Sequence, residues 1–199
     1  MATNRSTMNV LIIHASPRKK GVTSTLLSEI EASISSVHKI ESVRIYNLEM
    51  KPCIGCMKCR PDLTCILPRD DAHVLAEKVR WSDFIIIGCP VYWGNMPGSF
   101  KLFFDRNVPL FEYAEAKAIR YVPKPQLRGK RAALVVSCVA PFPYNLLRSQ
   151  SRGTIGALRT ILKAAGVRIE WVLTVSDSYN FEKKKERYLK KARRLAALI

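Results

Sequence analysis

At residues 10–25 the sequence reads VLIIHASPRKKGVTST, an apolar run followed by a loop rich in hydroxyl side chains. The unbroken run of aliphatic residues at 10–13 predicts a short buried strand. Apolar residues recur at helical spacing after the loop and predict a helix there: Leu26, Leu27, Ile30 and Ile34. The loop therefore lies between a strand and the N-terminus of a helix.

This loop has the composition of an anion-binding site. A helix N-terminus presents unpaired backbone N–H groups and the positive end of the helix dipole. The loop adds hydroxyl donors and cations, and Arg18 can form two parallel hydrogen bonds with a phosphate. We expect a phosphate monoester to be held by Ser16, Arg18, Lys19, Thr23 and Ser24. The alternative is an ordinary capped helix after a surface loop, since Ser and Thr are common caps.

The position of the loop favours a binding site. In an open parallel sheet, the first strand-to-helix turn lies at the carboxyl edge, where ligands bind. The loop contains neither G-x-G-x-x-G nor G-x-x-x-x-G-K-[ST], which argues against a dinucleotide-binding Rossmann domain and against a nucleoside triphosphatase.

The size of the chain is that of one domain. Its 199 residues can bury a substantial core, and we expect a single domain over residues 1–199. Residues 1–8 are polar and no run approaches the length of a membrane span, so we expect a soluble, cytoplasmic protein. Without a secretory signal, six cysteines are expected to be thiols or metal ligands rather than disulfides.

The net charge of +17 comes from 33 Lys and Arg against 16 Asp and Glu, and it suggests nucleic-acid binding as an alternative function. The densest basic run, however, carries Tyr188, Ala192, Leu195 and Ile199 at helical spacing. This pattern predicts a helix that packs on the core and turns its cations to solvent. We therefore expect no specific nucleic acid as a partner.

The rest of the chain alternates between strands and helices. Such an alternation predicts a parallel, doubly wound α/β sheet with helices on both faces. Two segments break the pattern: a Cys-rich loop at 47–69 and an aromatic stretch at 107–130, which we interpret as a lid or interface insertion. The further strands are expected at 39–46, 84–88, 131–138 and 167–175, and the further helices at 70–81, from 98 through Phe104, at 149–165 and in the basic run.

A second loop, between the strand at 84–88 and the next helix, has the composition of a ring-binding site. Aromatic side chains offer flat apolar area, and glycines let backbone approach a ligand closely. The alternative is a Gly-Pro turn whose aromatic residues fold onto the core. The candidate ring contacts are Pro90, Val91, Tyr92, Trp93, Gly94, Asn95 and Met96.

Several segments together resemble the NADPH-dependent FMN reductase-like flavoproteins of the flavodoxin fold. They are SPRKKGVTS at 16–24, DD at 70–71, SDFIIIG at 82–88, PVYWGNMP at 90–97 and KLFFDR at 101–106. The resemblance covers about residues 8–106 and is only architectural beyond.

The resemblance implies a five-stranded sheet of order 2-1-3-4-5 and FMN as cofactor. It assigns the FMN phosphate to Ser16, Arg18, Thr23 and Ser24, and the isoalloxazine ring to residues 90–96. Val22 departs from the Asn that is common at that place in the family.

Four cysteines form a compact group, Cys53-x2-Cys56-x2-Cys59-x5-Cys65. The spacing is typical of thiolates that bind an iron–sulfur cluster, and it resembles the iron–sulfur flavoprotein branch of the same family. Zinc bound by four thiolates and a loop of free thiols are the alternatives. Because the loop follows the second strand, we expect it at the carboxyl edge, on the side of the flavin.

These features predict an FMN-dependent oxidoreductase or electron-transfer flavoprotein, with a [4Fe–4S] cluster if the cysteines bind iron. The electron donor is expected to be NAD(P)H or a ferredoxin-like protein. No side chain is a convincing general acid or base: we interpret His14 and His73 as structural, and Cys89 and Cys138 as packed thiols. The aromatic segment from Phe111 to Tyr121 predicts a homo-oligomer, a dimer or tetramer, because it carries more apolar surface than a free loop exposes.

Overall fold

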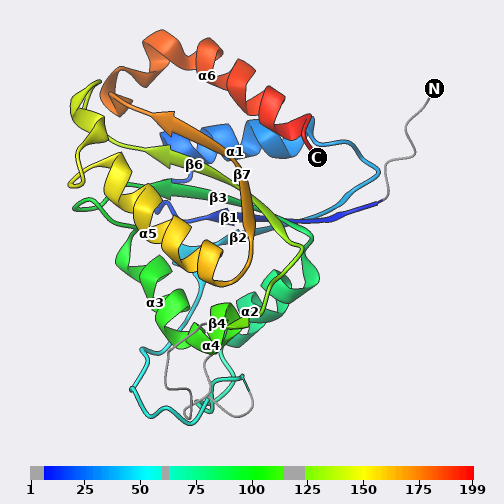
Figure 1. The fold of residues 1–199 in the computed structure, drawn as a ribbon. Coiled ribbons are helices and arrows are strands. Elements are labelled where there is room, and N and C mark those ends of the chain that lie inside the picture. Colours follow the sequence, from blue (N-terminus) through cyan, green and yellow to red (C-terminus); the bar gives the residue numbers. More distant parts are fainter. Residues whose placement is uncertain (1–6, 60–62, 114–123) are drawn as a thin grey trace.

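The computed structural model describes residues 7–59, 63–113 and 124–199. At its centre is a parallel five-stranded sheet with the order β2-β1-β3-β6-β7 (Figure 1). Numbered within this sheet, the order is 2-1-3-4-5, so the fold class and the strand order are confirmed. The strands are β1 (Asn9–His14), β2 (Lys39–Arg44), β3 (Phe84–Pro90), β6 (Arg131–Ser137) and β7 (Arg168–Val175).

Helices cover both faces of this sheet (Figure 1). One face packs against α1 (Val22–Ser33) and α6 (Phe181–Ala196), and the other against α2 (Asp71–Trp81), α3 (Gly98–Arg106) and α5 (Ser151–Ala164). The shorter elements are η1 (Ile45–Asn47), α4 (Val108–Phe111), β4 (Glu112–Tyr113), β5 (Lys124–Pro125), η2 (Tyr144–Leu146) and η3 (Ser178–Asn180).

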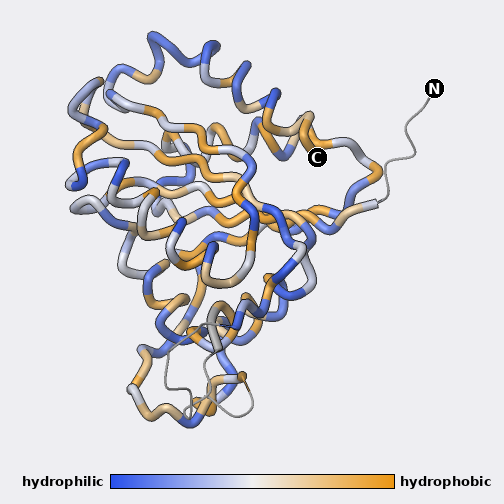
Figure 2. Tube along the Cα trace, viewed as in Figure 1, coloured by the Kyte–Doolittle hydropathy of each residue, from blue (hydrophilic) through white to orange (hydrophobic). Residues whose placement is uncertain are grey.

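The apolar run of β1 divides its side chains between two cores. Val10 and Ile12 pack under α1 and α6, whereas Leu11 and Ile13 pack with the helices of the opposite face. All four are essentially buried, because a parallel sheet with helices on both faces has no solvent-exposed side. The hydrophobic segments accordingly gather at the sheet in Figure 2.

The basic helix α6 is amphipathic, as the sequence predicts. Its buried residues include Tyr188, Ala192 and Leu195, and most of its Lys and Arg side chains are exposed. Arg193 reaches Glu29 on α1, with 2.6 Å between Nη1 and Oε1. The cations therefore lie on the solvent side of a helix that packs on the core.

Hydrogen bonds continue past the ends of the strands and fix the loops at the carboxyl edge, which lies to the left in Figure 1. The amide of Ala15 donates to Gly88 O at 2.8 Å, and that of Val91 donates to Ser137 O at 2.9 Å. Gly88 also lets α1 approach closely, since a Cβ there would lie 2.4 Å from Leu27 Cδ1. The loops that carry the predicted ligand contacts are thus anchored to neighbouring strands.

The segment at 107–130, predicted to be a lid or interface insertion, packs on the core in its first part. Its first residues form α4, and Phe111 packs edge-on against Phe103 and Phe104 with ring centroids 5.9 and 5.0 Å apart. Phe111 is 4% exposed, so counting it as apolar surface for an oligomer was wrong. Residues 114–123, on which the rest of that argument depended, lie outside the described residues.

None of the described helices has the length and the apolar character that crossing a bilayer requires.

Candidate functional site

The loop between β1 and α1 is held by its own hydroxyl groups. Ser16 Oγ accepts the amide of Arg18 at 3.2 Å, and Ser24 Oγ donates to Arg18 O at 2.8 Å. Ser24 is 1% exposed, so its hydroxyl shapes the loop. Lys19 is exposed. Of the predicted phosphate contacts, Ser16, Arg18 and Thr23 line a common cavity, whereas Lys19 and Ser24 do not.

The N-terminus of α1 opens toward this loop. Gly21 stands at the N-cap, and no described side chain caps the helix. A Cβ at Gly21 would lie 3.0 Å from Arg18 Cβ and 3.6 Å from Ser16 Oγ, so a side chain there would crowd the loop. Backbone N–H groups, hydroxyls and a guanidinium thus surround one end of the cavity, which is the donor set that a phosphate needs.

The cavity at the carboxyl edge has a volume of about 200 Å³. Pro90, Val91 and Tyr92 line it from the ring-binding loop predicted after β3. Tyr92 is 45% exposed, so part of this residue is accessible to a ligand. The two loops expected to share a ligand therefore do meet in one cavity.

The remaining predicted ring contacts take other roles in this structure. Tyr92 and Asn95 pair across a tight turn in which Trp93 and Gly94 both have positive φ, 52° and 72°. Trp93 is fully exposed. A Cβ at Gly94 would lie 2.6 Å from Arg148 O, so the absence of a side chain at Gly94 lets the backbone at Arg148 pack against this turn. Met96 is buried in the core on the α3 side. None of Trp93, Gly94, Asn95 and Met96 lines the cavity.

A third loop completes the cavity wall. Ser137, Cys138 and Val139 line it after β6, where the sequence offered no motif, and Ser178 lines it after β7. Burial raises the pKa of the Cys138 thiol, which agrees with a packed thiol. The contribution of Ser178 was missed, since only the parallel order of the strands places the loop after β7 beside the loop after β1.

The two histidines have structural surroundings. His14 is 2% exposed, and burial together with the nearby Arg44 lowers its pKa to about 4. His73 belongs to a capping box at the start of α2, in which Asp70 is the N-cap. The paired Asp70-Asp71 therefore begins a helix, as the sequence predicts. Cys89 is buried too, and burial raises its pKa.

All four cysteines of the group line a second cavity, of about 90 Å³, whose lining also includes the apolar residues Ile54, Ile66 and Val108. They form no disulfide. Among the described residues, no three His, Cys, Asp or Glu side chains come close enough to hold a single metal ion. Four thiols around one cavity are a donor set that fits a [4Fe–4S] cluster.

The position of this cavity corrects one prediction. Asp105 and Arg106, at the C-terminal end of α3, line it, whereas the ring-binding loop precedes the N-terminal end of the same helix. The nine residues of α3 span about 14 Å. The cysteine loop lies below α3 and α2 in Figure 1, and it shares no lining residue with the carboxyl-edge cavity. The prediction that the cysteine loop lies at the carboxyl edge, on the side of the flavin, is therefore wrong for the single chain. The loop after β2 extends past the helix layer instead.

Arg106 is a functional candidate that the sequence reasoning did not single out. Its side chain is fully buried and forms an ion pair with Asp70, with 2.7 Å between Nη1 and Oδ2. Its Nε donates to Cys65 Sγ at 3.3 Å. The motif KLFFDR contains this arginine, but no spacing rule connects it with a cysteine 41 residues earlier.

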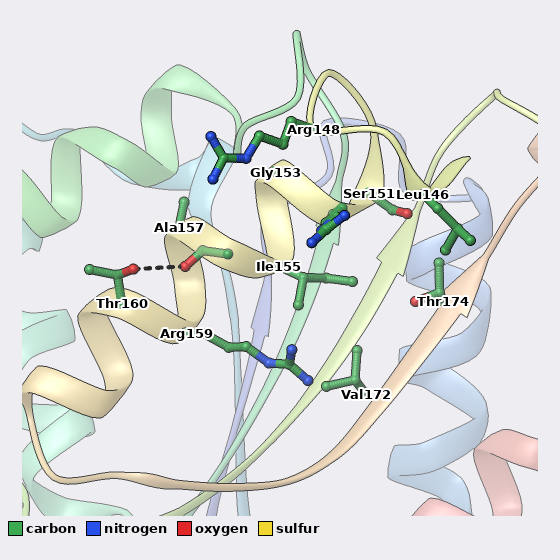
Figure 3. Close-up of a pocket in the computed structure, with 12 residues that line it drawn as sticks. Leu146, Arg148, Ser151, Gly153, Ile155, Ala157, Arg159, Thr160, Val172 and Thr174 are labelled. Atoms are coloured by element: carbon green, nitrogen blue, oxygen red, sulfur yellow. Dashed lines mark hydrogen bonds between the residues drawn. The ribbon is translucent and has the colours of Figure 1, made fainter. Parts of the chain in front are cut away.

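A groove of about 810 Å³ lies between α5 and β7 (Figure 3). Arg148, Arg152 and Arg159 line it, and none of the described lining residues is acidic. Ile155 on α5 and Val172 on β7 contribute apolar side chains to its two walls (Figure 3). The groove adjoins the turn after β3, since Arg148 O lies against Gly94.

Comparisons with known proteins agree with this arrangement. The family described as NADPH-dependent FMN reductase matches residues 8–167. An iron–sulfur flavoprotein of Methanocaldococcus jannaschii is 35% identical over 104 residues, which are 52% of this chain and 53% of that protein. One of Methanosarcina thermophila is 36% identical over 104 residues, 52% of this chain and 54% of that protein. The chain thus spans about half the length of these relatives.

Among solved structures, Smu.1420 from Streptococcus mutans superimposes with a TM-score of 0.78. The match covers 96% of this chain and 100% of that one at 18% identity, which supports the fold alone.

Proposed function

The chain belongs to the NADPH-dependent FMN reductase family, and from this premise we propose that it is an FMN-dependent oxidoreductase that also carries a [4Fe–4S] cluster. The observation that carries the flavin part is the cavity at the carboxyl edge. One end of it offers phosphate donors, and the other offers the backbone and ring of the loop after β3. A flavin mononucleotide has these two parts, a terminal phosphate and a flat ring.

The residues of the cavity would bind and orient FMN. Ser16, Thr23 and the α1 N-terminus would donate to the phosphate, and Arg18 would add charge. Val91 and Tyr92 would contact the ring. When bound, FMN supplies hydride and electron transfer, and the protein supplies position and electrostatics. His14 would take no part in proton transfer, because it is buried and its pKa of about 4 keeps it neutral.

A titration of the flavin-free protein with FMN and with FAD tests this assignment. Quenching of flavin fluorescence should report tighter binding of FMN, because the loop fits a terminal phosphate and the chain lacks a dinucleotide fingerprint. Equal or tighter binding of FAD would contradict it.

The cysteine cavity supports the second part of the proposal. Cys53, Cys56, Cys59 and Cys65 would be the cluster ligands, since all four surround one cavity and the matched relatives are named iron–sulfur flavoproteins. The cluster would supply one-electron redox chemistry. Zinc would only brace the loop, because it has no redox chemistry. Iron, zinc and sulfide analysis separates the two assignments.

We further propose that the electron donor is anionic, with NADPH as the first candidate. The arginine-lined groove between α5 and β7 carries positive charge that no described carboxylate neutralises, and it ends beside the turn after β3. Phosphate groups of a reduced dinucleotide would be attracted there. Arg152 and Arg159 both come from α5 and line the same groove, so one extended ligand could contact both.

A homo-oligomer remains our proposal for the assembly. The support is now a set of large exposed side chains in the loops after β3, β6 and β7, which also contribute to the carboxyl-edge cavity: Tyr92, Trp93, Phe142, Tyr144 and Tyr179. Exposed apolar surface around a site is typical of an interface. Sedimentation at micromolar concentration should show a dimer or tetramer, and a clean monomer would contradict it.

A further inference from the structure

Arg106 connects three segments that are distant in the sequence. Its Nη1 donates to Asp70 Oδ2 at 2.7 Å and to Lys51 O at 2.6 Å, and its Nη2 donates to Asp70 Oδ1 at 3.2 Å. These bonds join the C-terminal end of α3 to the N-terminus of α2 and to the start of the cysteine loop. The guanidinium plane is therefore fixed before any contact with a cysteine is considered.

This fixed guanidinium directs its Nε–H at Cys65 Sγ, 3.3 Å from Nε. The backbone of the same cysteine is held by a second side chain, since Cys65 O lies 3.0 Å from His73 Nε2. His73 is oriented in turn by Asp70, whose backbone amide donates to His73 Nδ1 at 3.2 Å in the capping box. Asp70 thus positions both residues that contact Cys65.

The charges in this network are arranged to keep Arg106 paired. Partial burial works against the ionised Asp70, but hydrogen bonds from Arg106 and the Lys51 amide hold its pKa at about 2. The carboxylate neutralises the buried guanidinium, so the pair adds little net charge. What it leaves at the half-buried sulfur is a directed N–H donor from a fully buried guanidinium.

We propose that Arg106 is a positioning residue that donates a hydrogen bond to the Cys65 sulfur in its cluster-ligating form and so raises the reduction potential of the cluster. The inference rests on the proposed cluster. Reduction adds negative charge to the cluster and its thiolates, and a donor close to a ligand sulfur stabilises the more negative state. Loss of this donor makes the cluster harder to reduce.

A purely structural role of Arg106 has different consequences. An arginine that only joins α2 to α3 would change the stability of the protein when replaced, and the potential of a fully loaded cluster would stay the same. The potential therefore separates the two roles.

Two substitutions should move the potential in opposite directions. Arg106→Lys keeps the positive charge but removes Nε and the planar fork, so the potential should fall. Asp70→Asn keeps a good helix N-cap and removes the negative charge near Arg106, so the potential should rise. Arg69→Lys is the matched control, because Arg69 pairs with Glu77 on the surface. The reduction potential of the cluster in this variant should equal that of the wild type.

The measurement is an anaerobic redox titration of each purified holoprotein, monitored by the electron paramagnetic resonance of the reduced cluster. Iron and FMN per chain are determined in parallel. Opposite shifts at full iron content support the proposal. Unchanged potentials, or shifts of the same sign, overturn it. If Arg106→Lys holds no iron or fails to fold, Asp70→Asn decides alone, and an unmoved potential there overturns the proposal. A wild-type chain that holds flavin but no iron would overturn the cluster assignment, which is a different failure.

Discussion

The two candidate sites lie at opposite ends of α3 and are built in different ways. The carboxyl-edge cavity is formed by strand ends and by backbone hydrogen bonds between adjacent loops, such as the one from Val91 to Ser137. The cysteine cavity is formed largely by a segment that has no helix or strand among its described residues at 51–59 and 63–67, together with the end of α3. That loop is held in part by side chains of the helices, chiefly Arg106 and His73.

This difference indicates how each site depends on its ligand. The carboxyl-edge cavity belongs to the sheet, so its shape is present without FMN and binding should cost little rearrangement. The cysteine loop is irregular over its described residues, so a bound cluster would contribute to its order. Damage to one site should therefore leave the other intact, and the following predictions test that independence.

The largest effect is expected for Cys65→Ser. Loss of one thiolate ligand should reduce bound iron from about four per chain to a small fraction, whereas FMN content should stay that of the wild type. Iron and flavin analysis of anaerobically purified protein measures both. Cys89→Ala is the matched control, because Cys89 is buried at the end of β3 and lines neither cavity. A parallel loss of FMN in Cys65→Ser would show that the two sites are coupled.

The opposite pattern, a loss at the FMN site alone, is expected for Arg18→Ala. Removal of one charge-assisted phosphate contact should weaken FMN binding by about 1.5–3 kcal/mol, or roughly 10- to 150-fold. Iron content should not change. Flavin fluorescence titration measures the affinity, and Lys20→Ala is the control, since Lys20 is exposed in the same loop and lines no wall of this cavity. An unchanged affinity in Arg18→Ala would remove Arg18 from the phosphate site.

The Asp70–Arg106 pair predicts a pH dependence of stability. The pKa of Asp70 lies at about 2 in the folded protein, below its ordinary value of 3.8. A lowered pKa means that the ionised carboxylate stabilises the fold above about pH 4 and that this contribution is lost as the pH falls through 2. The contribution should be about 2 kcal/mol.

Urea unfolding of the wild type and Asp70→Asn checks this. The wild type should be the more stable protein at pH 7, and the difference should shrink between pH 4 and pH 2. A difference that does not depend on pH would mean that capping or packing, rather than the charge of Asp70, is responsible.

The smallest effect is expected in the groove of Figure 3. Arg159→Gln should raise the KM for NADPH about two- to fivefold at low salt with little change in kcat, because an exposed charge contributes less than about 1 kcal/mol. Arg187→Gln, on the exposed side of α6, is the control. Steady-state kinetics at two ionic strengths measure the KM for NADPH of both variants. An equal effect of the two substitutions would contradict the assignment of the groove.

The same difference between the two sites explains what the sequence could predict. The strand at 10–13, the loop after it and the helix N-terminus follow from local patterns, and Ser16, Arg18 and Thr23 accordingly meet in the predicted cavity. The buried role of Met96 and the turn role of Gly94 were not predictable, because they depend on α3 and on the backbone at Arg148.

The cysteine spacing predicted a shared cavity but not its place. Sequence order puts the loop after β2, and a rule for loops after parallel strands puts it at the carboxyl edge. The structure instead extends the loop to the far end of α3, where Arg106 and Asp70 hold it. Those contacts join residues 36 and 55 positions apart, and no periodicity reports them.

One measurement tests the central claim that this chain carries two separate redox sites. The protein is purified without exposure to oxygen, and FMN, iron, zinc and acid-labile sulfide are determined per chain together with the absorption spectrum before and after dithionite. We expect one FMN and about four iron atoms with matching sulfide, and cluster absorption that dithionite bleaches. Zinc, or no metal, in a protein never exposed to oxygen would contradict the account.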